Sequence, residues 1–184
     1  MFQPMIHGLF LALGLILPLG AQNVFVFNQG ANQKQFIKTI PVIIAAGLCD
    51  TLLIVLAVLG VSVILLSLPM LQIVIYCIGF IFLIYMAWSL WKEKPQALDR
   101  YQSMSARKQI GFALSVSLLN PHAIIDTIGV IGTNAAIYES TDKMFFTLTT
   151  IIVSWVWFIF LAIAGKVVGN IDKTGKYILS LIHI

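Results

Sequence analysis

Two aspartates, Asp50 and Asp126, lie inside long apolar stretches of the sequence. An aspartate at the centre of a membrane helix costs on the order of 3 kcal/mol on insertion scales, so each one needs a partner or a purpose. No lysine or arginine lies deep in an apolar run to neutralise them. A cationic partner must be a passing solute, a proton, a metal ion or His122, which precedes Asp126 by one helical turn. We therefore expect a net negative cavity that prefers cations.

Amide side chains accompany two prolines that interrupt apolar runs. Gln22 and Asn23 follow Pro18, and Asn120 directly precedes Pro121. Proline lacks an N–H donor and displaces the carbonyl group four residues earlier, so each proline should break or kink its helix. Freed carbonyl groups persist in hydrocarbon only where protein groups or a water-filled cavity satisfy them. The amides therefore either bind a polar ligand or form hydrogen bonds across helices that repair the breaks.

The candidate ligand-binding residues are Asp50, Asp126, Asn120, Gln22 and Asn23. His122 is a candidate proton relay, and a neutral histidine hydrogen-bonded to a neighbouring helix is the alternative. Asp50 also has a structural alternative, in which it pairs with a polar residue and holds helices together. No spacing of ligand residues predicts a metal site or a bound cofactor.

The segments that would position these residues have the length of membrane spans. Of the 184 residues, 60% are hydrophobic and 10% are charged, whereas soluble domains carry about 25% charged residues. A helix of about 20 apolar residues crosses the hydrocarbon layer. We predict an all-α polytopic membrane protein with one domain, residues 1–184, and five to six transmembrane helices. The spans are predicted at about 5–27, 40–66, 69–91, 110–137 and 144–168, with a partial span at 177–184 and a cytoplasmic loop at 92–109.

The basic residues indicate an orientation. Ten of the eleven follow the first, third or fifth span, and only Lys143 lies on the other side. The positive-inside rule makes the common side cytoplasmic and places the N-terminus outside. The net charge of +4 is therefore a signal of topology, and it predicts no nucleic-acid partner. The expected partners are the lipid bilayer and a cationic solute, and the sequence leaves open whether the chain forms a homo-oligomer.

The first and fourth spans align without gaps at a single offset. The aligned pairs are Gly8 with Gly111, Pro18 with Pro121, and Asn23 with Asp126. Since the two spans run in opposite directions, this pattern predicts a three-plus-three inverted repeat in which helices one and four are broken.

At these residues the chain resembles the L-lysine exporter (LysE) family, and within it the arginine exporter (ArgO) subgroup. The resemblance rests on GLILPLGAQNVFVFNQG in the first span, GLCDTLLIVLAVLGV in the second and SLLNPHAIIDTIGVIG in the fourth. It implies a secondary-active exporter of basic amino acids in the bacterial inner membrane, with arginine, lysine or analogues such as canavanine as substrates. Members of the family usually have a complete last hydrophobic segment, whereas here only residues 177–184 follow the last polar patch.

Two other functions fit parts of the pattern. An intramembrane aspartyl protease would pair two aspartates as acid and base, but Ile125 stands where such enzymes have a glycine before the second aspartate. The sequence contains no HExxH, GxSxG or phosphate-loop motif, so we predict that the protein is not an enzyme. A cation channel or a non-transporting membrane subunit is the remaining alternative, and a channel would show flux that is insensitive to a driving gradient.

Overall fold

The computed structural model describes residues 2–18, 20–61, 104–120, 124 and 126–171, together with single positions between 68 and 88. The predicted span 177–184 and residues 92–103 of the predicted loop lie outside the described residues. In the predicted span 69–91, the described positions from 70 onward are helical. No strand occurs in the described ranges, which confirms the all-α class.

The described elements are helices that differ in length and winding. They are α1 (Phe2–Ile16), α2 (Ala21–Asn32), η1 (Phe36–Thr39), α3 (Ile40–Leu56), η2 (Ala57–Val61), α6 (Ala106–Leu118), η3 (Asp126–Ile131), α8 (Gly132–Ala135) and α9 (Ser140–Ile171). Both η2 and η3 are short π-helices, a winding that is frequent at functional sites.

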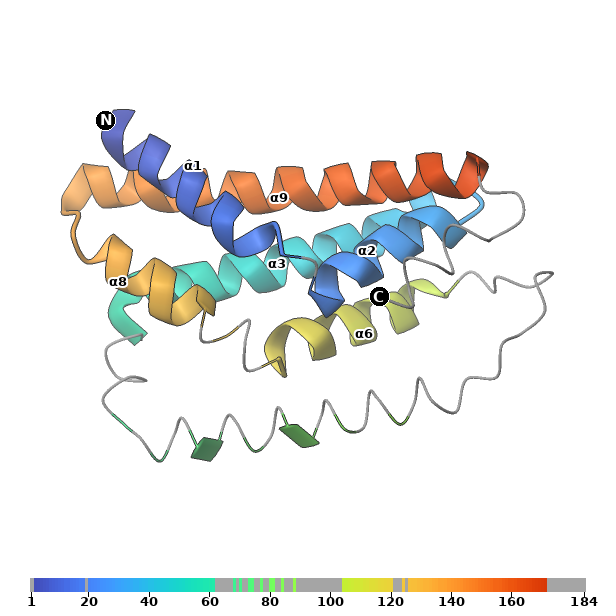
Figure 1. Cartoon of the computed structure of the whole chain (residues 1–184), viewed down its shortest axis with the longest axis horizontal. Helices are drawn as coiled ribbons and strands as arrows, with labels where there is room; N and C mark the ends of the chain where they lie inside the picture. The colour runs from blue at the N-terminus through green and yellow to red at the C-terminus, as the bar shows by residue number, and fades with distance from the viewer. Residues whose placement is uncertain are drawn as a thin grey trace.

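The long helix α9 runs along the length of the bundle (Figure 1). Its 32 residues extend over about 48 Å at 1.5 Å per residue, and it packs against α1, α2 and α3. Two helical stretches, Phe36–Gly60 and Thr141–Asn170, are long and apolar enough to cross a membrane. A third candidate is the pair α1 and α2, whose axes differ by 80°.

The first predicted span is interrupted where the sequence contains proline. Helix α1 ends at Ile16, and α2 begins at Ala21 after an N-cap residue, Gly20, in extended conformation. In the fourth predicted span, α6 ends at Leu118 and η3 begins at Asp126, and positions 121–123 and 125 between them lie outside the described residues. The second span keeps helical winding as far as Gly60, whose φ of +91° is one that glycine adopts readily.

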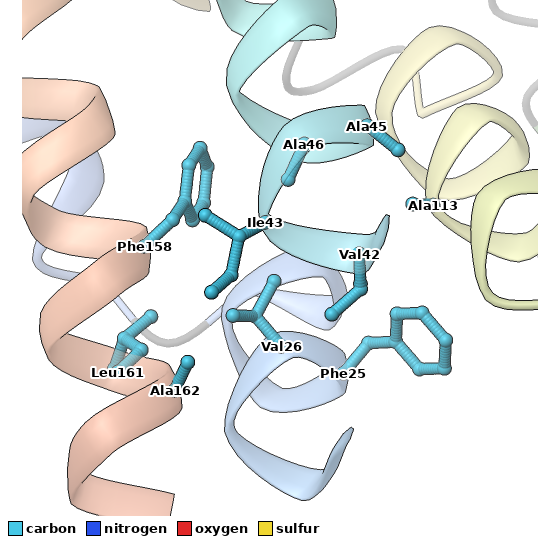
Figure 2. Packing of buried hydrophobic residues seen from close by; sticks show 10 residues of the cluster. All are labelled: Phe25, Val26, Val42, Ile43, Ala45, Ala46, Ala113, Phe158, Leu161 and Ala162. Carbon is cyan, nitrogen blue, oxygen red and sulfur yellow. The ribbon is translucent and has the colours of Figure 1, made fainter. Parts of the chain in front are cut away.

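A cluster of apolar side chains joins α2, α3, α6 and α9. In Figure 2, Ile43 of α3 lies between Phe158 of α9 and Val26 of α2, and each of the three is buried. Large apolar side chains on the opposite faces are exposed, among them Leu48 of α3 and Val156 of α9. This distribution suits a chain whose surroundings are lipid, because a water-soluble helix would carry polar residues on that face.

Glycines allow α2 and α9 to approach backbone to backbone. A Cβ atom on Gly30 would collide with the carbonyl oxygen of Ala162, and one on Gly165 would collide with that of Phe27. Small residues at such positions are typical of helices packed in membranes.

The basic residues of the described ranges, apart from Lys143, gather at one end of this bundle, which we call the basic end. Lys166 donates a hydrogen bond to the carbonyl of Lys34, and the carbonyl of Lys38 accepts one from Gln109, the neighbour of Arg107 and Lys108 in the first turns of α6. Lys143 lies 23 positions before Lys166 in the same helix, a rise of about 35 Å. The described part of the chain therefore separates these charges as the sequence predicts.

Two details differ from the simple segment pattern. The polar stretch from Asn28 to Gln35, which follows the predicted span 5–27, suggests a loop in the sequence. In the structure α2 continues to Asn32, and Gln29 and Gln33 are buried. The Gln33 Nε2 donates to the Met104 carbonyl and to the Gln29 Oε1, as described below. Cys49 is buried, but Cys77 is exposed, although apolar surroundings in the sequence suggest burial for both.

Candidate functional site

A cavity of ≈ 410 Å³ opens where the α1–α2 break faces α3, α9 and η3. Ligand pockets commonly measure roughly 300–1,000 Å³, so the space suits a small solute. The residues with polar side chains around it come from five segments of the chain: Gln22, Asn23, Asp50, Asn120, Thr127, Thr150 and Ser154. Four of the predicted binding residues, Gln22, Asn23, Asp50 and Asn120, are therefore brought together at one cavity.

Asp50 is the charged group of this cavity. Its Oδ1 accepts a hydrogen bond from Gln22 Nε2 at 3.2 Å, and its Oδ2 accepts one from Ser154 Oγ at 2.6 Å. Both partners are neutral, and in the described part of the chain no lysine or arginine side chain bonds to this carboxylate. The two donors orient the carboxylate and leave its charge uncompensated, so a cationic ligand would find an aligned acceptor.

Ser154 is a site residue that the sequence pattern does not single out. It lies in the middle of α9 and is buried, and its register places the hydroxyl against the carboxylate of α3. The available signal is a serine within an otherwise apolar run from Ile151 to Leu161. Serine is common in membrane helices for packing reasons, so this signal alone does not separate a ligand role from a structural one.

Replacing Ser154 by alanine should weaken the site without dismantling it. Hydrogen bonds to charged groups contribute about 1.5–3 kcal/mol, but water in the cavity can replace this donor, so we expect about a tenfold loss of affinity for a cationic ligand. Competition binding of a labelled guanidinium compound measures this change. Ser115→Ala is the matched control, because within the described residues the Ser115 hydroxyl bonds only to the carbonyl of Gly111 in its own helix. Equal affinities for both variants would contradict a role for Ser154.

A brace next to Asp50 fixes α3 against α9. Trp155 Nε1 donates to Thr51 Oγ1 at 3.0 Å, and that hydroxyl donates to the carbonyl of Gly47 at 2.7 Å. The Trp155 ring lies so close to Gly47 that an added Cβ would stand 2.7 Å from it. Since Thr51 and Trp155 directly follow Asp50 and Ser154, the brace holds the register that brings those two side chains together.

Asn23 serves the helix break. Its Nδ2 donates to the carbonyl oxygens of Ile16 at 2.7 Å and Pro18 at 3.1 Å. These carbonyl groups lie where α1 has ended, so they lack the helical N–H partners that a continuous helix would supply. The structure therefore engages this amide in the repair that proline makes necessary, while the residue also borders the cavity.

Asn23→Asp tests this repair with a side chain of the same shape. The carboxylate has no N–H to donate, so the Ile16 carbonyl would lose its donor, which costs about 1–3 kcal/mol. The Pro18 carbonyl still accepts a hydrogen bond from the Gly20 N–H at 2.8 Å. A negative charge in the first turn of α2 offsets only about 0.3–1 kcal/mol. We expect the melting temperature in detergent to fall by roughly 2–8 °C, whereas the control Asn28→Asp on the same helix should change it little. An unchanged melting temperature for Asn23→Asp would show that the break needs no amide.

The remaining predicted site residues belong to the fourth span. Asn120 follows the end of α6 and lines the cavity, and Thr127 of η3 lines it as well. Asp126 begins η3 one position before Thr127, while its side chain lies outside the described structure. Pro121 and His122 also lie outside the described residues. Among the positions that are described, no three His, Cys, Asp or Glu side chains lie close enough to hold a metal ion.

Comparison with known proteins identifies the family. The model of the LysE type translocator matches residues 13–182. The chain belongs to the LysE-type translocator family. This LysE-type chain is 53% identical over 175 residues to the protein named "Putative amino-acid transporter YisU" of Bacillus subtilis, covering 95% of this chain and 80% of that one. No solved structure matches significantly.

Proteins named for arginine export are also relatives of this LysE-type chain. The arginine exporter protein ArgO of Shigella flexneri is 33% identical over 181 residues, covering 96% of this chain and 84% of the relative. ArgO of Escherichia coli K12 is 32% identical over the same length. The resemblance seen in the sequence motifs is therefore confirmed for the family.

Proposed function

We propose that this chain exports basic amino acids, arginine foremost and also lysine or analogues such as canavanine, across the bacterial inner membrane. The observation that carries the proposal is the Asp50 carboxylate, which borders the cavity and is bonded to two neutral donors. A guanidinium or ammonium group would supply the missing positive charge. The names of the ArgO relatives support arginine as the substrate.

The amino-acid end of the substrate also has candidate partners. The N-terminus of α2 borders the cavity at Ala21 and Gln22, and its N-cap residue Gly20 supplies no side-chain cap. Backbone N–H groups and the positive end of the helix dipole favour an anion there, so this end suits the substrate carboxylate. A cation site and an anion site on one cavity wall select for a zwitterion with a basic side chain.

We propose further that helices one and four are broken spans of an inverted repeat. Two observations support this. At the offset that pairs Pro18 with Pro121, the end of α1 at Ile16 corresponds to position 119, one residue after the end of α6. Both discontinuities border the same cavity, through Pro18 and Asn120. By the positive-inside rule the basic end is cytoplasmic, which places the N-terminus outside.

Efflux of labelled arginine and lysine from cells that express the chain tests the function. We expect arginine efflux that exceeds the empty-vector level and collapses when ionophores remove the membrane gradients. Efflux that continues down the amino acid's own concentration gradient after the ionophores have removed the membrane's ion gradients would indicate a channel. No efflux of either amino acid would refute basic amino-acid export.

A further inference from the structure

A second polar cluster lies away from the cavity, at the basic end of the bundle. Gln33 Nε2 and Gln109 Nε2 both donate to the carbonyl oxygen of Met104, at 3.0 Å and 2.9 Å. Gln109 Nε2 also donates to the carbonyl of Lys38 at 3.0 Å. We call Gln33, Gln109 and the Met104 carbonyl the glutamine latch, because these bonds tie the end of α2 to η1 and to the start of α6.

Other contacts complete the closure at this end. Gln29, one turn before Gln33 on α2, accepts a hydrogen bond from the Gln33 amide at 3.3 Å. Lys166 of α9 donates to the carbonyls of Gln33 at 2.6 Å and Lys34 at 3.1 Å, beyond the last turn of α2. Residues of α2, η1, α6 and α9 therefore meet at the latch, which joins three regions of the chain that are distant in sequence.

The glutamine latch is closed, but some of its polar atoms lack hydrogen-bond partners. Gln33 and Gln109 are each 1% exposed, and neither Oε1 atom has a hydrogen-bond donor within the described structure. The hydroxyl of Thr39, in the η1 helix beside the latch, is equally buried and also lacks a partner there. Buried acceptors without donors destabilise a conformation, and water would satisfy them if this end opened. These unpaired atoms therefore lower the stability of the closed arrangement relative to an open, hydrated one.

Helix α2 connects the latch to the cavity. Gln22 lies in its first turn and bonds to Asp50, and Gln33 lies just after its last residue. The twelve-residue helix is a rod about 18 Å long, and it is the half of the broken span that lies toward the basic end. A change at its Asp50 end must therefore displace its latch end as well, unless the helix itself unwinds.

We propose that the glutamine latch is the gate at the basic end, and that a cationic substrate at Asp50 opens it through α2. The proposal rests on the proposed function. A substrate cation competes with Gln22 Nε2 for Asp50 Oδ1, which releases the first turn of α2 from α3. The helix then shifts as a unit, its Gln33 end leaves Met104, and water reaches the two orphaned Oε1 atoms.

Maleimide labelling of a cysteine placed behind the latch tests the gate. Thr39→Cys is nearly isosteric and sits at a position that is 0% exposed, in a background with Cys49→Ala and Cys77→Ser that retains transport. Purified protein in detergent is labelled with and without arginine. We expect arginine to raise the labelling rate by about threefold or more, as a shift toward the open population requires.

Three variants separate the parts of the proposal. Gln109→Leu and, independently, Gln33→Leu remove latch donors and should raise the labelling rate without arginine. Gln22→Leu removes the bond that the substrate would break, so it should also raise that rate and abolish the further increase with arginine. Gln35→Leu, which alters an exposed glutamine just beyond α2, is the matched control and should change neither rate. Size-exclusion profiles establish that each variant is folded, and having two latch variants keeps the test decisive if one is not.

The outcomes distinguish the gate from the function. Wild-type arginine efflux combined with arginine-independent labelling of Thr39→Cys would overturn the gate and leave the export function standing. Absence of arginine efflux would overturn the function, while the basal rates of the two latch variants would still decide whether the latch closes this end. Basal rates equal to wild type in a folded Gln33→Leu or Gln109→Leu variant would overturn the latch.

Discussion

Asp50→Asn is expected to abolish arginine export while the protein still inserts and folds. The substitution keeps the shape of the side chain, and its amide can still meet Ser154 and Gln22 after reorientation, since serine and glutamine both donate and accept. It removes the negative charge, and charge-assisted hydrogen bonds contribute about 1.5–3 kcal/mol each. Loss of one such bond lowers affinity about 10- to 150-fold. A bidentate guanidinium would lose two, enough to eliminate transport at physiological substrate concentrations.

Canavanine resistance of cells and uptake of labelled arginine into inverted vesicles measure the effect. Asp126→Asn is expected to have the same result if the inverted repeat places both acids at the substrate. Glu139→Gln is the matched control, because it also removes one negative charge but from an exposed position before α9. Full resistance in cells that express either aspartate variant would exclude that residue from the site, and full resistance with both would refute the acidic-cavity mechanism.

Gly165→Ala and Gly30→Ala are expected to separate α2 from α9. An added Cβ at either position collides with a backbone carbonyl rather than with a flexible side chain, so the helices themselves must move. Overpacking of this kind costs about 1–3 kcal/mol and occasionally more. For a chain of this size the melting temperature should fall by about 2–4 °C per kcal/mol. Arginine export should fall as well, because α2 carries Gln22.

Thermal unfolding in detergent, followed by size-exclusion chromatography, measures this loss. Gly111→Ala is the matched control: Gly111 lies within α6, and no atom stands within 4 Å of a Cβ built there. Alanine is favoured over glycine in a helix by about 1 kcal/mol, so this control should be as stable as wild type or slightly more stable. Wild-type stability in both Gly165→Ala and Gly30→Ala would show that the two helices can move apart freely.

Several features follow from the sequence because they depend on local chemistry. The scarcity of charge and the length of the apolar runs predict helices that face lipid, and the described chain is helical with exposed apolar faces. Pro18 predicts an interruption, and α1 ends two residues before it. The isolated acid Asp50 predicts a polar cavity, since an aspartate does not stay in hydrocarbon without hydrogen-bond partners.

Other features depend on which helix faces are in contact. The pairing of Asp50 with Ser154 joins positions 104 residues apart, and it requires that α9 turn this serine toward α3. The sequence pattern of α9 does not predict that register, because a lipid-facing helix is apolar on most sides and its hydrophobic periodicity is weak. The polar stretch after the first span is misleading for a similar reason. Gln33 is buried there because the Met104 carbonyl comes close enough to accept its hydrogen bond, and the buried Gln29 donates to the Met104 sulfur.

The sequence by itself therefore determined the helical class and the family, and it predicts lipid surroundings and a negatively charged cavity. Each of these follows from residue types, from their order, or from the cost of placing a charge in hydrocarbon. The tertiary structure alone decided which neutral donors hold Asp50, that Asn23 serves the helix break, and that buried glutamines close the basic end. Those outcomes depend on distances between helices, which are set by glycine contacts and side-chain packing among segments far apart in the chain.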